Sequence, residues 1–486
     1  MTFQDATVLA PFIAAILVAL AILTVDFIFP GRKVPALIAT FAGLALVAAL
    51  VVITGQSTFE AFGGAYGVDP LTTFLDILFL AIVALTIAFA PDYLEERGLP
   101  VPEFAALLVF AMSGAMLLAA SGDLLVLFLG LELMVLPGYV LAGYHKTDGF
   151  STEGAIKYFL LGSFSSAIFL FGLAFVWGIT GTTNIAEVAA YMGQVAGGAI
   201  PMSPGLGLAL AFMTTGVAFK IAAVPLHYWT PDAYQGSPTP VTGYLSVGPK
   251  IGAFALIIRL FAQGLADLAI DWNIVFMVLA ALTMTLGNLV ALQQDNVKRM
   301  LAYSSIAHTG YMLVGFAAYG AGNIAGMEAL LFYGAAYAFM NLCAFGVVAA
   351  IQRRTGVTSN LSTFAGLVRR EPAMAWLLTL FLLSLTGIPP TVGFFGKFLV
   401  ISAAVEVGGP LTVLAILTVV NAAIAAFYYL RVVVYMFMRD PAGELPRLRH
   451  GRLLWAGLAV STFLTIILGV FPNLLLEIVG VAAAAI

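Results

Sequence analysis

The sequence predicts an all-α polytopic membrane protein with about fourteen transmembrane helices, on the basis of its composition, its apolar runs and the placement of its basic residues. Of the 486 residues, 62% are hydrophobic and 9% are charged, and the mean hydropathy is +1.06. A soluble domain carries roughly 25% charged residues. The longest polar stretches, near residues 91–102, 180–204 and 439–452, are too short to fold alone. Residues 1–486 are therefore predicted to form a single transmembrane domain.

The apolar runs define the predicted helices. A helix needs about 20 residues to cross roughly 30 Å of hydrocarbon. Runs of that length begin near residues 8, 34, 70, 103, 123, 152, 206, 241, 272, 299, 324, 373, 410 and 452. The seventh and twelfth runs are too long for one plain span and contain Pro225, Pro231, Pro389 and Pro390. Because proline removes a backbone donor and clashes with the preceding turn, we predict that both helices are discontinuous, with breaks at Pro225 and at Pro389-Pro390.

The basic residues test this assignment independently, because short cytoplasmic loops carry an excess of Lys and Arg. Most of the 20 basic residues fall in loops that follow odd-numbered runs: Arg32, Lys33, Arg97, Lys146, Lys298, Arg299, Arg353, Arg354, Arg369, Arg370, Arg439, Arg447, Arg449 and Arg452. The loops after even-numbered runs carry none, so both termini are predicted on the periplasmic side of a bacterial inner membrane. Arg259 and Arg431 lie toward helix ends, where they are expected to snorkel to the surface. The remaining basic residues are Lys157, Lys220, Lys250 and Lys397.

A weak internal repeat divides the chain. Asp123, Leu129, Gly138, Tyr139, Leu141 and Gly143 recur 172 positions later as Asp295, Leu301, Gly310, Tyr311, Leu313 and Gly315. This match pairs the fifth helix with the tenth and the broken seventh with the broken twelfth. Because each repeat holds five helices, an odd number, the second copy is predicted to be inverted. We expect N-terminal helices in 1–102, the first repeat in 103–265, the second in 270–440 and a C-terminal helix in 450–486.

Glu132 and Lys220 are the first candidates for chemistry. Glu132 lies about nine residues into the fifth helix, roughly 13 Å deep, where acids are usually functional. Lys220 lies five residues before Pro225 and is its strongest candidate partner. At an effective dielectric constant of about 20, unit charges about 6 Å apart interact by roughly 3 kcal/mol. Movement of the Glu132 carboxylate would therefore be enough to decide whether Lys220 keeps or releases its proton. The alternatives are a neutral, hydrogen-bonded Glu132 and a static ion pair.

Further ionisable residues extend this pair into a predicted proton relay. Lys250 lies in the eighth helix, Lys397 just past the break of the twelfth, and His308 at similar depth in the tenth. His227 flanks the first break. A lone histidine is more often a hydrogen-bonded core residue, but in line with lysines an imidazole can accept and release protons. Lys157 is the weakest member, because it lies near the cytoplasmic end of the sixth helix and snorkelling also explains it.

Several cofactor classes are disfavoured by the same residues. A relay rich in lysine repels metal cations, although Na⁺ remains an alternative to H⁺. His227 and His308 lie on separate helices with no recognisable haem-ligand pairing, and the single cysteine, Cys343, cannot hold an iron–sulfur cluster. The aromatic content of 12% is mostly Phe along apolar faces, which indicates lipid contact rather than a quinone site.

Five segments carry a resemblance to a known family: LGLELMVLPGYVLAGY, EGAIKYFLLGSFSSAIFLFG, FKIAAVPLHYWTPDAYQGSPTPV, KRMLAYSSIAHTGYM and GIPPTVGFFGKF. They resemble the antiporter-like membrane subunits of proton-pumping NADH:quinone oxidoreductase, respiratory complex I, over nearly the whole chain. The resemblance implies fourteen helices, inverted five-helix repeats and proton transfer driven by distant quinone chemistry. It places the family's glutamate of helix five and its lysines of helices seven, eight and twelve at Glu132, Lys220, Lys250 and Lys397. Lys157 and His227 also fall on family positions.

Within this family the N-type members are favoured. L-type members carry a long C-terminal lateral helix that is absent here, and M-type members have glutamate where Lys397 stands. The resemblance implies a translocase subunit with no cofactor or metal of its own, with FMN, iron–sulfur clusters and quinone in partner subunits. The expected partners are subunits M, K, J and L-type neighbours, together with the lipid bilayer. Nucleic acid is not among them.

Three functions remain open at this stage. The first is a proton-translocating module of the larger redox complex. The second is a self-contained Mrp-type Na⁺(K⁺)/H⁺ antiporter subunit or the similar subunit of a membrane hydrogenase. The third, a purely structural scaffold, leaves four deep lysines without a role.

Overall fold

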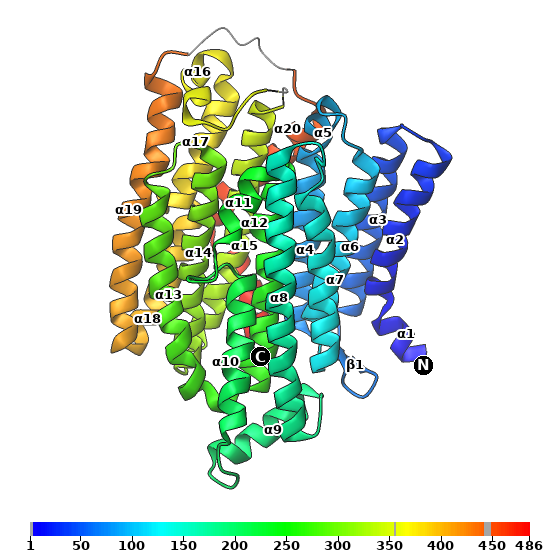
Figure 1. Cartoon of the computed structure of the whole chain (residues 1–486), viewed down its shortest axis with the longest axis vertical. Helices are drawn as coiled ribbons and strands as arrows, with labels where there is room; N and C mark the ends of the chain where they lie inside the picture. The colour runs from blue at the N-terminus through cyan, green and yellow to red at the C-terminus, as the bar shows by residue number, and fades with distance from the viewer. Residues whose placement is uncertain (1–2, 354–355, 442–448) are drawn as a thin grey trace.

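In the computed structural model, which describes residues 3–353, 356–441 and 449–486, the chain forms a bundle of long helices aligned along one axis (Figure 1). Arg354 and Arg447, two of the basic residues in predicted loops, lie outside the described residues. In chain order the elements are α1 (Phe3–Val8), α2 (Ala10–Ile28), α3 (Lys33–Thr54), β1 (Phe59–Ala61), β2 (Tyr66–Val68), α4 (Pro70–Phe89), α5 (Pro91–Glu96), α6 (Val101–Ala119), α7 (Leu124–Ala142), α8 (Gly149–Thr180), α9 (Ile185–Ala196), α10 (Pro204–Lys220), α11 (Trp229–Gly236), α12 (Thr239–Ile257), the π-helix η1 (Ile258–Gly264), the 3₁₀-helix η2 (Ala266–Leu268), α13 (Ala269–Ala291), α14 (Val297–Gly320), α15 (Ala325–Ile351), the 3₁₀-helix η3 (Leu361–Phe364), α16 (Leu367–Arg370), α17 (Pro372–Thr386), α18 (Val392–Val407), α19 (Pro410–Met438), α20 (Arg452–Val470) and α21 (Asn473–Ala483).

The all-α membrane fold class is confirmed. Each predicted run begins within three residues of a helix start, the helices being α2, α3, α4, α6, α7, α8, α10, α12, α13, α14, α15, α17, α19 and α20. Within the described residues, 11 helical segments are long and apolar enough to cross a membrane. The segments α10 and α17 are shorter because each ends at a break in its helix. The number of crossings and the inverted repeats stay predictions.

Two helices form the centre of the bundle. The apolar windows of Thr239–Gly264 and Ala325–Ile351 are wholly buried, whereas those of α2, α3, α8 and α19 are mostly exposed. A helix buried on all sides sits in the core of a membrane bundle, and one that presents an apolar face outward meets lipid or a partner. The core helix α12 carries Lys250, so this lysine is held at the centre of the molecule.

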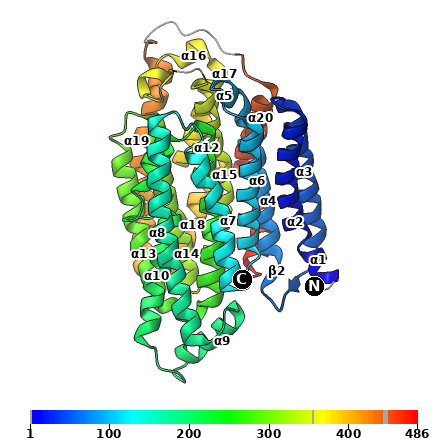
Figure 2. The ribbon, with the colours of Figure 1, turned by 45° about the vertical axis from the view of Figure 1, so that its right-hand side comes forward.

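The two ends of the bundle differ in charge and in structure. One end, uppermost in Figure 1, carries α5, α16 and the loops with the basic residues. The opposite end carries α1, α9, the chain end at Ile486 and a two-stranded hairpin in which Phe59 of β1 lies opposite Val68 of β2. Figure 2 shows the same separation from a second side.

Both predicted helix breaks are present. The helix that starts with α10 stops at Lys220 and resumes as α11, and the helix that starts with α17 stops at Thr386 and resumes as α18. The peptide bonds Val224-Pro225 and Pro389-Pro390 in these breaks are cis. Pro225, Pro389 and Pro390 are exposed on the outside of the bundle, whereas Lys220 and Lys397 lie buried on its inside.

Candidate functional site

Lys220 occupies the inner side of the first helix break. Its side chain is 6% exposed and donates to Ser166 Oγ of α8 at 2.7 Å and to Tyr139 Oη of α7 at 3.4 Å. Backbone groups freed by the break also find partners, because Val224 N–H donates to Thr283 Oγ1 and Trp229 Nε1–H to the carbonyl of Phe219. The break is thus held open by side chains, and its lysine faces neutral hydroxyls.

Glu132 lies partly buried on α7. Its Oε1 atom has no hydrogen-bond partner, and its charge interacts with Lys220, Tyr139 and Tyr158. In the part of the chain that the structure describes, no ion pair joins Glu132 to Lys220. The predicted pairing is therefore an interaction across space rather than a direct contact, and a small movement of either side chain would change its strength.

Lys250 connects α12 to α14. It is 1% exposed, and its ammonium donates to the carbonyl of Ser305 at 2.7 Å, to Ser305 Oγ at 2.6 Å and to Thr309 Oγ1 at 3.1 Å. Thr309 Oγ1 in turn donates to the carbonyl of Ile221 at 3.0 Å, inside the first helix break. Lys250 and the broken helix are therefore joined through one threonine.

His308 of α14 lies within reach of the charges of both Lys250 and Lys397. It is 1% exposed, with Nδ1 2.7 Å from Tyr333 Oη and Nε2 3.2 Å from Tyr429 Oη. Tyr429 also bonds to Ser304, the neighbour of the Ser305 that holds Lys250. The charge of the imidazole interacts with both Lys250 and Lys397. An imidazole with a hydroxyl at each nitrogen can take a proton on one side and release one on the other.

Lys397 lies beyond the second helix break and is 5% exposed. It donates to the carbonyls of Leu385 at 2.9 Å and Thr386 at 2.8 Å, which are the last residues of α17. Cations are stabilised at helix C-termini by the unpaired carbonyls and the helix dipole. The ammonium also lies 5.0 Å from the ring centre of Tyr311. The break therefore creates the electronegative position that this lysine occupies.

Lys220, Lys250, His308 and Lys397 form a file of buried ionisable groups, called the proton file below. Lys157 and His227 lie at its edge. Lys157 is partly exposed and forms ion pairs with Glu153 and Asp232, both at 2.7 Å. Asp232 of α11 also accepts from Arg299 of α14 at 2.7 Å, so the ion pairs link α8, α11 and α14. His227 is partly buried, and its Nδ1 atom has no hydrogen-bond partner.

One expectation for a basic residue was wrong. Arg259 does not snorkel to the surface: it is 5% exposed, because its guanidinium makes a bidentate ion pair with Asp69 at 2.7 and 2.9 Å. Lys298, at the start of α14, is also buried: it is 4% exposed and donates to the carbonyls of Gln235 and Ser237. In both cases a partner far away in sequence replaces water.

Hydrogen-bonding residues that sequence reasoning missed complete the file. The tyrosines Tyr333 and Tyr429 bind His308, and the hydroxyls of Ser166, Ser305 and Thr309 bind the lysines. In the sequence these residues stand in apolar helices without a distinguishing spacing. Their only signal is a polar atom in a membrane helix, which usually bonds to a neighbouring helix.

The arrangement is suited to proton transfer between weakly solvated groups. The ammonium groups of Lys220, Lys250 and Lys397 and the imidazole of His308 are buried, and none of them pairs with a carboxylate among the residues described. No group of three or more His, Cys, Asp and Glu side chains that could hold a metal ion occurs in residues 3–353, 356–441 and 449–486.

Comparisons with known proteins match this architecture. A sequence model of the family described as NADH:quinone oxidoreductase/Mrp antiporter, TM, matches residues 121–425. NADH-quinone oxidoreductase subunit N from Trichlorobacter lovleyi is 39% identical over 97% of this chain and 95% of its own length. A chain of respiratory complex I from Thermus thermophilus with bound aureothin superposes with a TM-score of 0.78 and 32% identity, covering 96% of this chain and 98% of its own. A chain of the Mrp complex from Dietzia sp. DQ12-45-1b superposes with a TM-score of 0.80 and 25% identity, covering 100% and 97%.

Proposed function

Because the chain belongs to the NADH:quinone oxidoreductase/Mrp antiporter family, and within it to the subunit N proteins of NADH-quinone oxidoreductase, we propose that it moves protons through Lys220, Lys250, His308 and Lys397. It is a proton-translocating membrane subunit of that enzyme, whose FMN and iron–sulfur clusters sit in other subunits. The observation that carries the proposal is the burial of these four groups without a carboxylate partner in the described chain.

The chemistry of the relay follows from that burial. A buried ammonium group without a carboxylate partner is costly, so its proton is retained only while nearby dipoles compensate for lost hydration. Lys220 depends on two hydroxyls and on the distant charge of Glu132. Movement of α7, which carries Glu132, would therefore load or unload Lys220. Lys157 and His227 supply the path at the basic end, beside the break.

The alternative function is Na⁺ or K⁺ exchange for H⁺ by a self-contained antiporter. The superposition on the Dietzia Mrp chain is as close as that on the complex I chain, so the fold alone favours neither. Sequence identity favours the first function, since the complex I chain is 32% identical to this chain and the Mrp chain 25%.

Purification in mild detergent tests this choice. We expect the chain to co-purify with flavin and iron–sulfur proteins and to show no Na⁺/H⁺ exchange when reconstituted alone in liposomes. Cation-dependent proton exchange by the isolated chain would instead support the antiporter. The partners that we propose among the membrane subunits of the complex are M, K and J and L-type neighbours, and cross-linking within the purified complex would identify them.

The membrane orientation is part of the proposal. We propose that the end with the basic loops faces the cytoplasm of a bacterial inner membrane and that both termini face the periplasm. Alkaline phosphatase fused after Ile486 should therefore be active, whereas a fusion in the loop after Arg97 should be inactive. Fusion to green fluorescent protein should report the opposite pattern, and two active phosphatase fusions would contradict the orientation.

We also propose the inverted repeats 103–265 and 270–440, between helices 1–102 and 450–486. A matched pair of backbone bridges supports them, beside the matching helix breaks. Asp123 at the start of α7 bridges Asn184 at the start of α9, and Asn296 at the start of α14 bridges Asn360 at the start of η3. These equivalent bridges lie at opposite ends of the bundle, as inversion requires.

A further inference from the structure

Asp76 is a buried acid that the proton file above does not use. It lies in α4, is 4% exposed, and its Oδ1 atom has no hydrogen-bond partner. A buried carboxylate is costly unless it is paired or protonated. An unpaired acid within a membrane helix is by default a candidate for a functional group.

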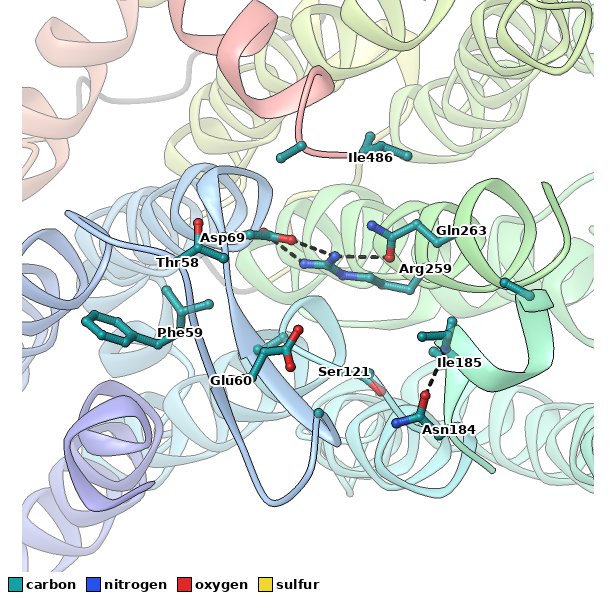
Figure 3. A pocket seen from close by; sticks show the side chains of 18 of the residues that line it. Thr58, Phe59, Glu60, Asp69, Ser121, Asn184, Ile185, Arg259, Gln263 and Ile486 are labelled. Carbon is teal, nitrogen blue, oxygen red and sulfur yellow. Dashed lines mark hydrogen bonds and ion pairs between the residues drawn. The ribbon is translucent and has the colours of Figure 1, made fainter. Parts of the chain in front are cut away.

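A cavity of about 680 Å³ lies at the end of the bundle opposite the basic loops, and it is lined by Asp69, which caps α4, and not by Asp76 itself. It opens at the surface beside the exposed residues Thr58 and Glu60, and its inner wall includes Asp69 and Arg259 (Figure 3). The cavity holds both charged and polar side chains and is large enough for many water molecules.

Arg259 and Asp69 form a fully bonded pair at the inner wall. The guanidinium donates to both carboxylate oxygens of Asp69, to Thr72 Oγ1 at 2.8 Å, to the carbonyl of Ala119 at 2.8 Å and to Gln263 Oε1 at 3.1 Å. Arg259 is part of the π-helix η1, a local distortion that often marks functional positions. All donors of the guanidinium are therefore occupied without Asp76.

Asp69, Thr72 and Asp76 follow one another along one face of α4. Asp69 caps the helix, Thr72 follows at the next turn, and Asp76 comes seven residues after Asp69, which is about two turns. Asp76 therefore lies about 9 Å along the helix axis from the first residue of α4, farther from the cavity than the Arg259–Asp69 pair. The row of Asp69, Thr72 and Asp76 leads from the cavity toward the core of the bundle.

Three ionisable groups interact with Asp76: Asp69 at the start of α4, Arg259 of η1 and Tyr66 of β2. Among the described residues, no hydrogen bond or ion pair joins Asp76 to the charged groups of the other elements packed on α4. Lys250 of α12 is bonded to α14. The other charged groups are Lys33, Asp92, Glu95, Glu96, Glu103 and Arg452 at the far end of α4, Glu328 on α15, and Glu477 on α21, which lines an apolar pocket with Thr73 and Ile77 of α4.

The charge balance makes Asp76 sensitive to the pair. Burial works against the Asp69 carboxylate, but the charge of Arg259 and the hydrogen bonds from Arg259 and Thr72 outweigh it and lower the pKa of Asp69 below its usual value. Asp69 therefore stays ionised at neutral pH and neutralises Arg259. A second carboxylate at Asp76 would compete for the same guanidinium, so ionisation of Asp76 is favoured only when Arg259 leaves Asp69.

We propose that Asp76 is a proton-holding site at the end of the membrane opposite the basic loops, and that opening of the Arg259–Asp69 pair connects it to water in the cavity. The Asp76 carboxylate accepts H⁺ from a hydronium ion in the cavity and leaves water, and the reverse step releases it. No other bond changes. The site deepens the proposed proton translocation and rests on it.

The test uses the assembled complex in membrane vesicles with NADH as the electron donor. We expect Asp76→Asn to lower proton pumping at least about tenfold, in the range of lost acid–base groups, and Asp76→Glu to retain pumping with a shifted pH profile. Infrared difference spectra should lose a protonated-carboxyl band in Asp76→Asn and show it displaced in Asp76→Glu. Glu60→Gln, which removes an exposed acid at the same cavity, is the matched control and should change neither measurement.

The outcomes separate this inference from the function that it rests on. Normal pumping by assembled Asp76→Asn, together with loss of pumping in Lys220→Ala, would overturn the Asp76 site alone. Normal pumping by assembled Lys220→Ala would overturn the relay itself. If Asp76→Asn does not assemble, Asp76→Glu decides, because an unchanged pH profile and an unmoved carboxyl band would contradict a proton-holding role.

Discussion

Replacement of Lys220 by alanine should abolish most NADH-driven proton pumping in membrane vesicles, with a decrease of at least about tenfold. The substitution removes the ammonium group at the inner side of the first break and leaves the hydroxyls of Ser166 and Tyr139 without it. Assembly should be preserved, because Thr283 and Trp229 still bind the backbone of the break. Glu132→Ala should also reduce pumping, since the charge that acts on Lys220 is lost.

Two further variants distinguish proton transfer from a fixed charge. Lys220→Arg keeps the positive charge but cannot release a proton at physiological pH, so it should pump as poorly as the alanine variant. Thr215→Val, on the same helix, removes a hydroxyl that is bonded only to its own helix and should pump normally. Recovery of pumping by Lys220→Arg would show that a fixed positive charge is sufficient, and normal pumping by assembled Lys220→Ala would contradict the relay.

Replacement of Lys250 by methionine is expected to have a similarly large effect. Methionine keeps much of the volume of the side chain at the centre of the bundle but removes the donor that binds Ser305 and Thr309. The link between α12 and the first break then has no group that can carry a proton. Pumping should decrease at least about tenfold, measured against the NADH oxidation that an artificial electron acceptor supports in the same membranes.

The matched control for Lys250→Met is Ser246→Ala in the same buried helix. Ser246 accepts from Asn341 at 2.7 Å and donates to the carbonyl of Gly243, so its loss costs buried hydrogen bonds but no titratable group. We expect normal pumping from this variant. Equal losses in both variants would indicate that packing of α12, and not the ammonium of Lys250, limits transport.

Helix positions could be predicted closely because they depend on local chemistry. Apolar length decides where a helix begins, and prolines decide where it breaks, so the starts of α4 and α19 and the breaks near Pro225 and Pro389 follow from the chain alone. Burial of Lys220, Lys250 and Lys397 was predicted from their depth in apolar runs.

The partners of those residues could not be predicted in the same way. Glu132 was expected to contact Lys220, but two hydroxyls from α7 and α8 bind that lysine instead. Arg259 was expected to reach the surface. Its partner Asp69 lies 190 positions away in the chain, and no local sequence pattern indicates that the two residues meet. The tyrosines around His308 were not singled out, because they stood among many aromatic residues, most of them Phe, whose content as a whole indicated lipid contact.

The sequence by itself determined that this chain is a membrane bundle, which helices are broken and that Lys220, Lys250 and Lys397 are buried, because hydropathy and backbone geometry act within one helix. Only the tertiary structure decided which groups meet: the hydroxyls around each lysine, the tyrosines at His308, and Asp76 beyond the Arg259–Asp69 pair. These contacts join helices far apart in the chain, and side chains of equal polarity compete for them. Packing selects among these competitors, and no local pattern in the chain records the result.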